Sequence, residues 1–143
     1  SGEDEKMIGG YFHIVNDIER IGDHALNFDE LYNEITDKGA KFSDIAISEF
    51  EEMNDVVIKM FEISKKIFSS KSKKDLTKLH DYEELSDKIN LKLFDNHYAR
   101  LQKQECHFEL SPYYTSIISE LERIADHLTN IGYASFNPTG DEE

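Results

Sequence analysis

Apolar residues recur every three or four positions along four long segments, and none of these segments alternates apolar and polar residues as a strand does. The segments run from about Glu5 to Thr36, from Ser43 into the polar run SSKSKKD, from Asp75 to about Gln104, and from Ser111 to Asn137. This period predicts four α-helices. Because the connections are short, we expect an all-α fold in which the helices form an antiparallel four-helix bundle.

Each predicted helix carries an apolar stripe that we expect to line a shared core. The stripes are Ile14, Ile18, Ile21, Ala25 and Phe28; Ile47, Phe50, Met53, Val57, Met60 and Ile67; Leu79, Tyr82, Leu85, Ile89, Leu93 and Leu101; and Ile117, Leu121, Ile124, Leu128 and Ile131. Ser43 is a good N-cap for the second helix. Ser111 is the predicted N-cap of the fourth helix, with Pro112 at its first position.

The length of 143 residues fits one domain, which we place at residues 3–137. Ser1-Gly2 resembles a cloning remnant, and residues 138–143 are predicted to be an acidic C-terminal tail. No stretch approaches the ~20 apolar residues of a membrane span. The single cysteine, Cys106, cannot form an internal disulfide, so a reducing compartment is expected.

The chain is strongly acidic, with 30 Asp and Glu residues against 16 Lys and Arg residues and a formal charge of −14. This charge would repel DNA or RNA, so nucleic acid is not an expected partner. The 38% of hydrophobic residues is enough to build a core, which argues against a disordered acidic tail.

The first and fourth segments share a sequence, DIERIGDHALNF from Asp17 and ELERIADHLTNI from Glu120. The two copies are offset by 103 residues, and Glu, Arg, Ile, Asp, His and Asn coincide. Matching polar residues at the same helical phase indicate duplicated halves.

The repeat places two carboxylates one helical turn apart on the flank of each stripe: Glu19 and Asp23 in the first helix, Glu122 and Asp126 in the fourth. If a pseudo-twofold axis relates the halves, the two pairs would face each other across one flank. Four such carboxylates repel unless cations neutralise them, and oxygen ligands suit hard cations. We therefore expect these four residues to bind metal.

The same spacing occurs at Glu51/Asp55 and Glu83/Asp87, so an isolated pair would be read as a solvated face. Glu84 and Asp87 could add ligands, although a solvated face is the favoured interpretation of that segment.

The remaining charged motif residues fit structural roles. His24 and His127 project away from the carboxylate pairs, as interface or capping histidines would. Arg20 and Arg123 can each pair with the aspartate three residues on.

The segments ERIGDHALN and ERIADHLTN resemble the signature of the PhoU family of phosphate-uptake regulators. The stretches DEKMIGGYFHIVNDIERIGDH and YARLQKQECHFELSPYYTSIISELERIADH are similar to the PhoU-like soluble domain of bacterial sodium-dependent phosphate cotransporters. The resemblance implies a PhoU-like helical fold, in which the four helices correspond to the last helix of a first three-helix repeat and a complete second repeat.

The resemblance also implies a non-catalytic regulatory domain at the cytoplasmic face of the inner or plasma membrane. Its expected partner is the transmembrane part of the same transporter, and self-association is a further expectation. The family's motif carboxylates are associated with multinuclear metal clusters, which here implies Fe, Mn, Mg or Zn on Glu19, Asp23, Glu122 and Asp126. Spacing does not fix the metal, and at −14 we expect no direct phosphate binding without it.

Two other functions stay open. The first is a free-standing PhoU-type regulator acting with a phosphate-specific ABC transporter and a sensor kinase. The second is a ferritin-like di-metal oxidase, although such sites use Glu-x-x-His and here the histidine follows the glutamate by five positions. The sequence shows no nucleophile beside a base and no Gly-rich phosphate cradle, so we expect no enzyme activity.

Overall fold

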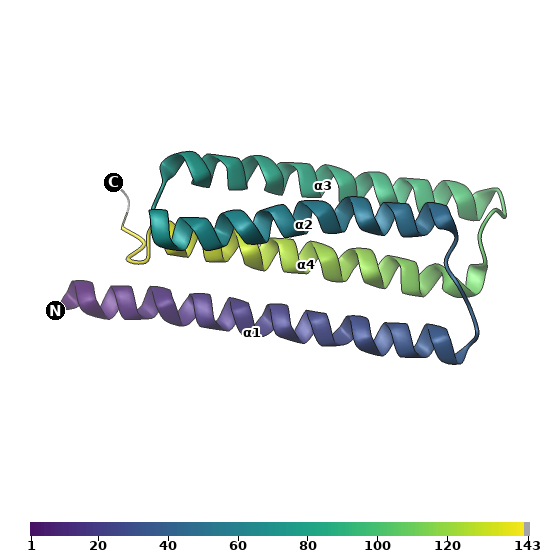
Figure 1. Ribbon diagram of the computed structural model, residues 1–143, viewed down its shortest axis with the longest axis horizontal. Helices are drawn as coiled ribbons and strands as arrows, with labels where there is room; N and C mark the ends of the chain where they lie inside the picture. Colours follow the sequence, from purple (N-terminus) through teal and green to yellow (C-terminus); the bar gives the residue numbers. More distant parts are fainter. Residues whose placement is uncertain (142–143) are drawn as a thin grey trace.

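The computed structural model describes residues 1–141, and this part of the chain forms helices and no strands, which confirms the all-α prediction. The elements are α1 (Gly2–Asp37), α2 (Asp44–Ser70), α3 (Lys73–Gln102), the short 3-10 helix η1 (Phe108–Leu110) and α4 (Ser111–Phe136). Successive long helices run in opposite directions (Figure 1). Within residues 1–141, no helix has the length and apolar content needed to cross a membrane.

The helix starts follow local capping chemistry, with one exception. The hydroxyl of Ser43 accepts a hydrogen bond at 3.2 Å from a backbone N–H of the first turn of α2, so the predicted N-cap is confirmed. Pro112 lies in the first turn of α4, as predicted. The N-cap of α4, however, is Leu110, and the prediction of Ser111 was wrong. The Ser111 hydroxyl is instead 2.7 Å from Nε2 of His97 on α3.

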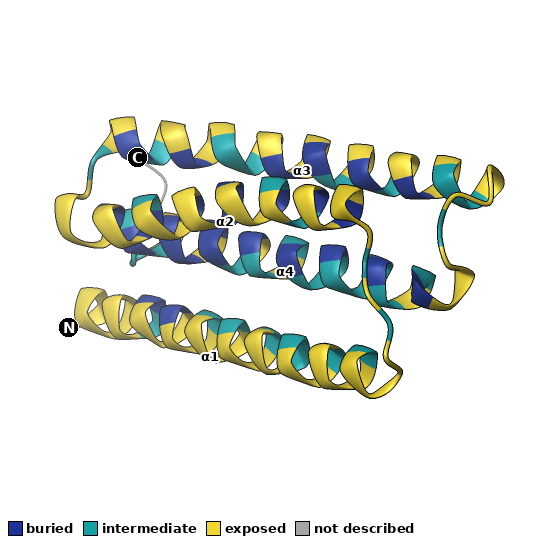
Figure 2. Ribbon diagram, turned by 45° about the vertical axis from the view of Figure 1, so that its right-hand side comes forward, coloured by how far each residue is buried: buried dark blue, intermediate teal, exposed yellow. Residues whose placement is uncertain are grey.

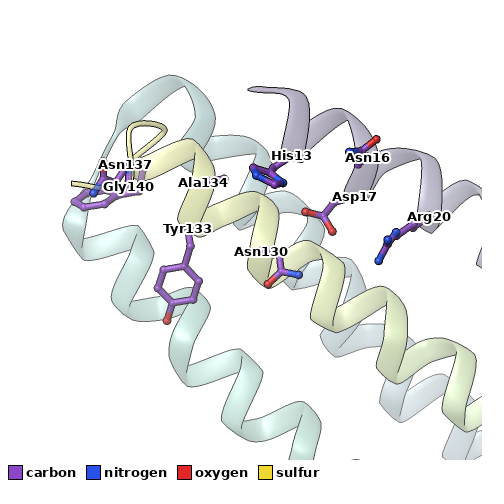
Figure 3. A pocket seen from close by; sticks show the side chains of 10 residues that line it. His13, Asn16, Asp17, Arg20, Asn130, Tyr133, Ala134, Asn137 and Gly140 are labelled. Carbon is purple, nitrogen blue, oxygen red and sulfur yellow. Dashed lines mark hydrogen bonds between the residues drawn. The ribbon is translucent and has the colours of Figure 1, made fainter. Parts of the chain in front are cut away.

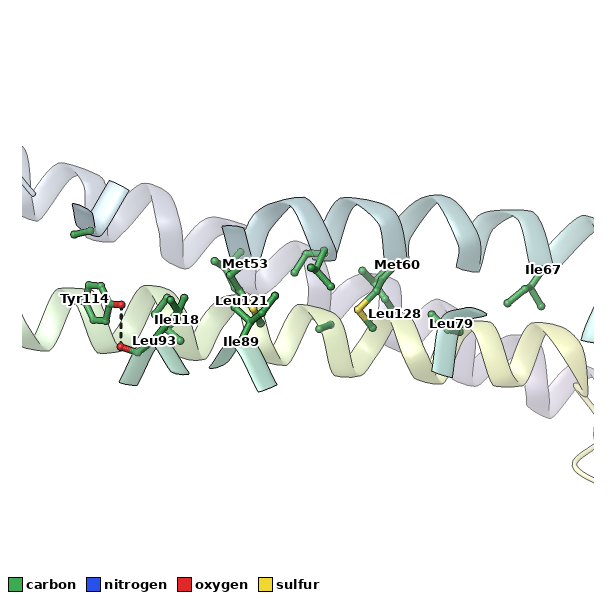
Figure 4. Close-up of a cluster of buried hydrophobic side chains, with 14 residues drawn as sticks. Met53, Met60, Ile67, Leu79, Ile89, Leu93, Tyr114, Ile118, Leu121 and Leu128 are labelled. Atoms are coloured by element: carbon green, nitrogen blue, oxygen red, sulfur yellow. Dashed lines mark hydrogen bonds between the residues drawn. The ribbon is translucent and has the colours of Figure 1, made fainter. Parts of the chain in front are cut away.

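The core lies between α2, α3 and α4, which pack on one another (Figure 4). Its completely buried apolar side chains include Met53, Met60, Ile67, Leu79, Leu93 and Ile118. Gly132 of α4 leaves room for Leu79 of α3, because a Cβ at this position would overlap Leu79 Cδ2.

Helix α1 lies at the edge of the bundle and packs chiefly on α4 (Figure 1). Only Gly10 and Ile14 of this helix are buried, and most of its surface is exposed (Figure 2). Four predicted stripe residues are exposed instead of buried: Ile18, Ala25, Ile47 and Leu85. The α1 stripe is wider than its contact with one neighbouring helix, and this leaves apolar surface uncovered.

The segment after α4 folds back onto the start of α1. Lys6 Nζ and Asp141 Oδ1 are 2.6 Å apart, and the backbone of Pro138 occupies the space over Gly10 that a Cβ would fill. The predicted acidic tail is therefore seen only as far as Asp141, and residues 142–143 lie outside the described part of the chain.

A buried polar network joins α2, α3 and α4 near η1. Glu49 is only 6% exposed, and its Oε1 lies 2.5 Å from Nη2 of Arg100. Asn96 Nδ2 donates to Glu49 Oε2 at 2.8 Å, and the Tyr114 hydroxyl donates to Oε1 at 3.2 Å. Burial, and then the charge of Glu49, raise the pKa of Tyr114 well above its usual value, so the hydroxyl keeps its proton. The His97 ring stacks on Tyr114 with centroids 4.4 Å apart.

Candidate functional site

The two copies of the repeated motif meet at the α1–α4 interface. His24 Nδ1 on α1 lies 2.5 Å from Glu120 Oε2 on α4, and His127 Nδ1 on α4 lies 2.8 Å from Asp17 Oδ1 on α1. The two imidazole rings stack between these pairs, with centroids 5.4 Å apart. His127 is the counterpart of His24, and Glu120 is the counterpart of Asp17. Because the histidine of each copy pairs with the acidic residue of the other, the contact has the pseudo-twofold relation expected of duplicated halves.

This interface confirms the prediction that His24 and His127 are interface residues. All four side chains of the reciprocal pairs are largely buried, at 12–15% exposed. Asn27 Nδ2 adds a further hydrogen bond to Glu120 Oε2 at 3.2 Å. Helix α1 is therefore attached to the bundle by these polar contacts as well as by the buried Ile14 and by Ile21 and Phe28, which pack against the core.

A polar groove of about 820 Å³ opens beside one of the reciprocal pairs, between α1 and the end of α4 (Figure 3). Asp17 and Arg20 line it from α1, and Asn130 lines it from α4. The predicted pairing of each arginine with the aspartate three residues on is absent among residues 1–141. Arg20 lines the groove. Arg123 Nη1 is 3.9 Å from Oε1 of Glu120, which precedes it by three residues on α4.

The structure does not bring the four motif carboxylates into one patch. Since His24 and His127 face the partner helix, the carboxylates on the other side of each helix are directed elsewhere. On α1, Glu19 and Asp23 are exposed. On α4, Glu122 and Asp126 interact instead with acidic residues of α3. The expectation that the two pairs face each other across one flank is therefore wrong.

The α4 pair belongs to what we call the α3–α4 carboxylate cluster, made of Glu83, Asp87, Glu122 and Asp126. Burial, then Asp126 and Asp87, raise the pKa of Glu122, while a hydrogen bond from Asn90 opposes this rise. Burial and then Asp87 raise the pKa of Asp126, and the same two causes raise the pKa of Glu83. Negative charge is thus crowded at this cluster, in which Glu83 and Glu122 are half-buried and Asp87 and Asp126 are exposed.

Polar side chains surround this cluster. Asn90 lies beside Glu122, and the Asn90 Oδ1 atom is buried without a hydrogen-bond partner in the described part of the chain. At the other end, the Tyr133 hydroxyl is 3.4 Å from His80 Nδ1, and this nitrogen is 3.9 Å from Glu83 Oε2. An unsatisfied amide oxygen beside crowded carboxylates is a donor set that suits a hard cation.

The family model of the PhoU domain matches residues 50–134 of the chain. The chain belongs to the PhoU family. This match runs from α2 through α3 into the last turns of α4, so it includes the whole α3–α4 carboxylate cluster. PhoU domains are regulatory and act in phosphate uptake. The four long helices of this chain are consistent with the PhoU-like helical bundle. Neither the curated proteins nor the solved structures gave a significant match.

Helix α1 of this PhoU chain lies outside the matched residues, and so do Glu19 and Asp23. Its relation to the PhoU domain rests on the internal repeat and on the reciprocal pairing with α4. The two motif copies therefore differ in their surroundings: the α4 copy faces other carboxylates, and the α1 copy faces outward.

The fit of a metal ion differs between the two copies. The donor chemistry of the α3–α4 carboxylate cluster fits a hard cation, because its ligands are oxygen atoms and its carboxylates are crowded. In residues 1–141, however, no three His, Cys, Asp or Glu side chains stand close enough together to hold an ion as they are placed. To hold an ion, the side chains of the cluster would have to rotate toward one another. Glu19 and Asp23 would need further donor atoms from another molecule or segment.

Glu83 and Asp87 could not be singled out from the sequence. They share the four-residue spacing of Glu122 and Asp126, but that spacing also occurs in the exposed pair on α2. Packing of α3 against α4 half-buries Glu83, while Asp87 is exposed like the pair on α2 and is set apart only by its closeness to Glu122 and Asp126. Glu84, the other possible ligand on α3, has a 61% exposed side chain, and its Oε1 atom lies 3.6 Å from His80 Nε2.

Proposed function

We propose that this PhoU domain is the cytoplasmic regulatory domain of a sodium-dependent phosphate cotransporter and acts on the transmembrane part of that transporter without catalysing a reaction. The PhoU match over residues 50–134 carries the proposal. The similarity of the two longer stretches to cotransporter domains supports the sodium-dependent context. A PhoU regulator that acts with an ABC transporter and a sensor kinase is the alternative that the test must separate.

Phosphate uptake by the complete protein tests the transporter role. The complete open reading frame is expressed in cells that lack other phosphate transporters, with and without residues 3–137, and sodium-dependent phosphate uptake is measured across external phosphate concentrations. We expect the truncation to change the dependence of uptake on phosphate while transport continues. A reading frame without membrane spans, or uptake unaffected by the truncation, would favour the free-standing regulator.

We further propose that the α3–α4 carboxylate cluster binds a divalent or trivalent cation through Glu122 and Asp126, with Glu83 and Asp87 nearby. A bound cation would neutralise the crowded carboxylates and link α3 to α4. Fe, Mn, Mg and Zn are the candidate ions. Glu19 and Asp23 are proposed as a second ligand pair that is completed from outside the chain.

Metal content of variants tests these ligands. Elemental analysis and Mn²⁺ titration calorimetry are applied to wild type, Glu122→Gln/Asp126→Asn and Glu19→Gln/Asp23→Asn. The matched control is Glu51→Gln/Asp55→Asn, which removes an equally spaced pair from the exposed side of α2. We expect the α4 variant alone to lose tight metal binding. Equal metal in wild type and the α4 variant would remove Glu122 and Asp126 as ligands.

Phosphate itself is proposed to bind only through such a metal, because the metal-free chain carries a formal charge of −14. Calorimetry with inorganic phosphate, before and after Mn²⁺ addition, measures this directly. Tight binding to the chelator-treated protein would contradict the proposal. The di-metal oxidase gains no support from the geometry, because His24 and His127 bind carboxylates across the α1–α4 interface.

A further inference from the structure

The internal repeat allows the two ends of the α1–α4 interface to be compared, and at one end a single carboxylate meets three donors. Glu120 Oε2 lies 2.5 Å from His24 Nδ1 and accepts a hydrogen bond from Asn27 Nδ2 at 3.2 Å. The other oxygen, Oε1, is 3.9 Å from Nη1 of Arg123. One carboxylate thus lies beside an imidazole, an amide and a guanidinium group.

The other end has the same kinds of residue around a shorter carboxylate. The counterparts, 103 residues apart, are Asp17, His127, Asn130 and Arg20. Asp17 Oδ1 lies 2.8 Å from His127 Nδ1, but the side chains of Asn130 and Arg20 form no hydrogen bond or ion pair within residues 1–141. Aspartate is one methylene shorter than glutamate. The amide and the guanidinium group that contact a carboxylate at one end therefore have none at the other.

These two donors lie at the polar groove between α1 and the end of α4. Figure 3 shows Arg20 on α1 across the groove from Asn130 on α4. The volume of about 820 Å³ lies within the ~300–1,000 Å³ typical of small-molecule sites. Ala134 and Phe136 add apolar lining, and Phe136 follows Asn130 by about 9 Å along α4 at 1.5 Å per residue. A ligand that fills the groove would therefore join a polar head to an apolar body.

The charges around the groove favour a ligand with one negative charge. Asp17 and Arg20 are the charged side chains among the described residues that line it, and His13 is a further basic group. Asp17 is already paired with a histidine, so Arg20 is left to pair with a ligand. Each donor also has an aspartate within one helical turn, Asp23 on α1 and Asp126 on α4, and these would repel a second negative charge. A planar carboxylate, which can accept two parallel bonds from an arginine, suits the groove better than a phosphate dianion.

We propose that this groove binds a small monocarboxylate with an apolar body. Its carboxylate accepts hydrogen bonds from Arg20 and Asn130, and its apolar part lies against Ala134 and Phe136. The ligand would take the role that Glu120 has at the other end of the interface and would link α1 to the end of α4. The proposal goes beyond the regulatory function and depends neither on the transporter nor on a bound metal.

The probe is phenylbutyrate, which joins a carboxylate to a phenyl ring through a short methylene chain. Phenylbutyramide is the neutral match, and acetate lacks the apolar body. Two-dimensional ¹⁵N NMR of the whole metal-free chain follows the backbone amides and the side-chain amides of Asn16 and Asn130 during titration. Titration to about 10 mM measures a Kd of ~1 mM. We expect phenylbutyrate to shift the signals of the groove residues, and the amide and acetate to bind more weakly.

Removal of the groove's cation tests the assigned contact. Arg20→Gln should weaken phenylbutyrate binding about tenfold, as the loss of a hydrogen bond between charged groups does. Arg123→Gln is the matched control, because it makes the same change of charge at the counterpart position outside the groove. We expect the control to keep the Kd of wild type.

A longer side chain at position 17 tests the comparison between the two ends. In Asp17→Glu the added methylene lets the protein's own carboxylate approach Asn130 and Arg20, as Glu120 approaches their counterparts. This variant keeps both donors, so a Kd weakened about tenfold would show competition for them and support the proposal. Circular dichroism verifies that each variant is helical. An unchanged Kd in helical Asp17→Glu would overturn the comparison on which the proposal rests.

Three other results would also overturn the proposal. Equal binding of phenylbutyramide would show that the negative charge is not recognised. Equal weakening in Arg20→Gln and Arg123→Gln would show attraction by overall charge alone. Displacement of phenylbutyrate by an equal concentration of inorganic phosphate would assign the groove to phosphate instead of a carboxylate, whereas unchanged phenylbutyrate signals in phosphate would support the carboxylate.

Discussion

The buried ion pair between Glu49 and Arg100 provides the sharpest test of how the bundle is held together. Arg100→Met keeps most of the side-chain volume and removes the positive charge. Glu49 then keeps its hydrogen bonds from Asn96 and Tyr114 but loses the cation 2.5 Å away. Arg100→Met therefore leaves a buried carboxylate whose negative charge is balanced only in part, by these two hydrogen bonds.

The expected loss follows from burial. The side chains of Glu49 and Arg100 are 7% and 13% exposed, so water cannot replace the missing charge. Removing one partner of such a pair costs about 3–5 kcal/mol, and the remaining hydrogen bonds to Glu49 favour the lower end, about 3 kcal/mol. At ~3–4 °C per kcal/mol for a chain of this size, the melting temperature falls by about 10 °C. Adding Glu49→Gln should recover about 1–2 kcal/mol by removing the uncompensated charge.

Urea unfolding followed by circular dichroism measures both variants and a control. Lys92→Met removes the cation from the pair with Glu52, which is also 2.5 Å long but has side chains 52% and 40% exposed. That control should cost no more than about 0.5 kcal/mol. The reasoning is refuted if Arg100→Met costs no more than Lys92→Met, or if Glu49→Gln restores nothing.

Three further features are tested by substitution, each followed by urea unfolding. Glu122→Gln should stabilise the metal-free chain at neutral pH by about 0.5 kcal/mol, because burial and neighbouring carboxylates disfavour the ionised form; a loss of stability would contradict this. Burial lowers the pKa of His97 from its ordinary 6.5, so the unfolded chain binds that proton first and stability falls as the pH drops below 6.5; His97→Gln should flatten this part of the profile, and an unchanged slope would exclude the residue. Gly132→Ala should cost about 1–3 kcal/mol through overlap with Leu79, while Gly22→Ala, in open space, should stabilise by up to about 1 kcal/mol. Equal changes in stability at the two glycines would show that Leu79 moves aside from a Cβ at position 132 without a cost in stability.

The helices were predictable because their signal is local. Periodic apolar residues and polar breaks set the four segments, and the ends of the helices lie within a few residues of the expected positions. An apolar stripe does not indicate which helix packs against it. Ile14 and Ile18 belong to the same predicted stripe, yet Ile14 is 6% exposed and Ile18 is 56% exposed. The difference comes from α1 having one main neighbour, which is a property of the assembled bundle.

The candidate site was predictable to the extent that it is repeated. The matching His24 and His127 could be assigned to an interface, because their helical phase separates them from the carboxylates. Glu83 and Asp87 could not be chosen over Glu51 and Asp55, because both pairs have the same spacing on acidic helices. The distinction requires knowing that the α3 pair packs against α4.

The two motif copies show how one sequence pattern can have two different surroundings. In both copies the histidine side forms the α1–α4 interface, and the carboxylate side is left to whatever packs beside it. On α4 that neighbour is α3, which adds Glu83 and Asp87. The negative charge of the four carboxylates favours binding of a metal ion. On α1 no other described element packs beside Glu19 and Asp23, which are exposed. Mn²⁺ should therefore raise the melting temperature of wild type and of Glu19→Gln/Asp23→Asn, whereas an equal rise in Glu122→Gln/Asp126→Asn would show that the metal binds elsewhere.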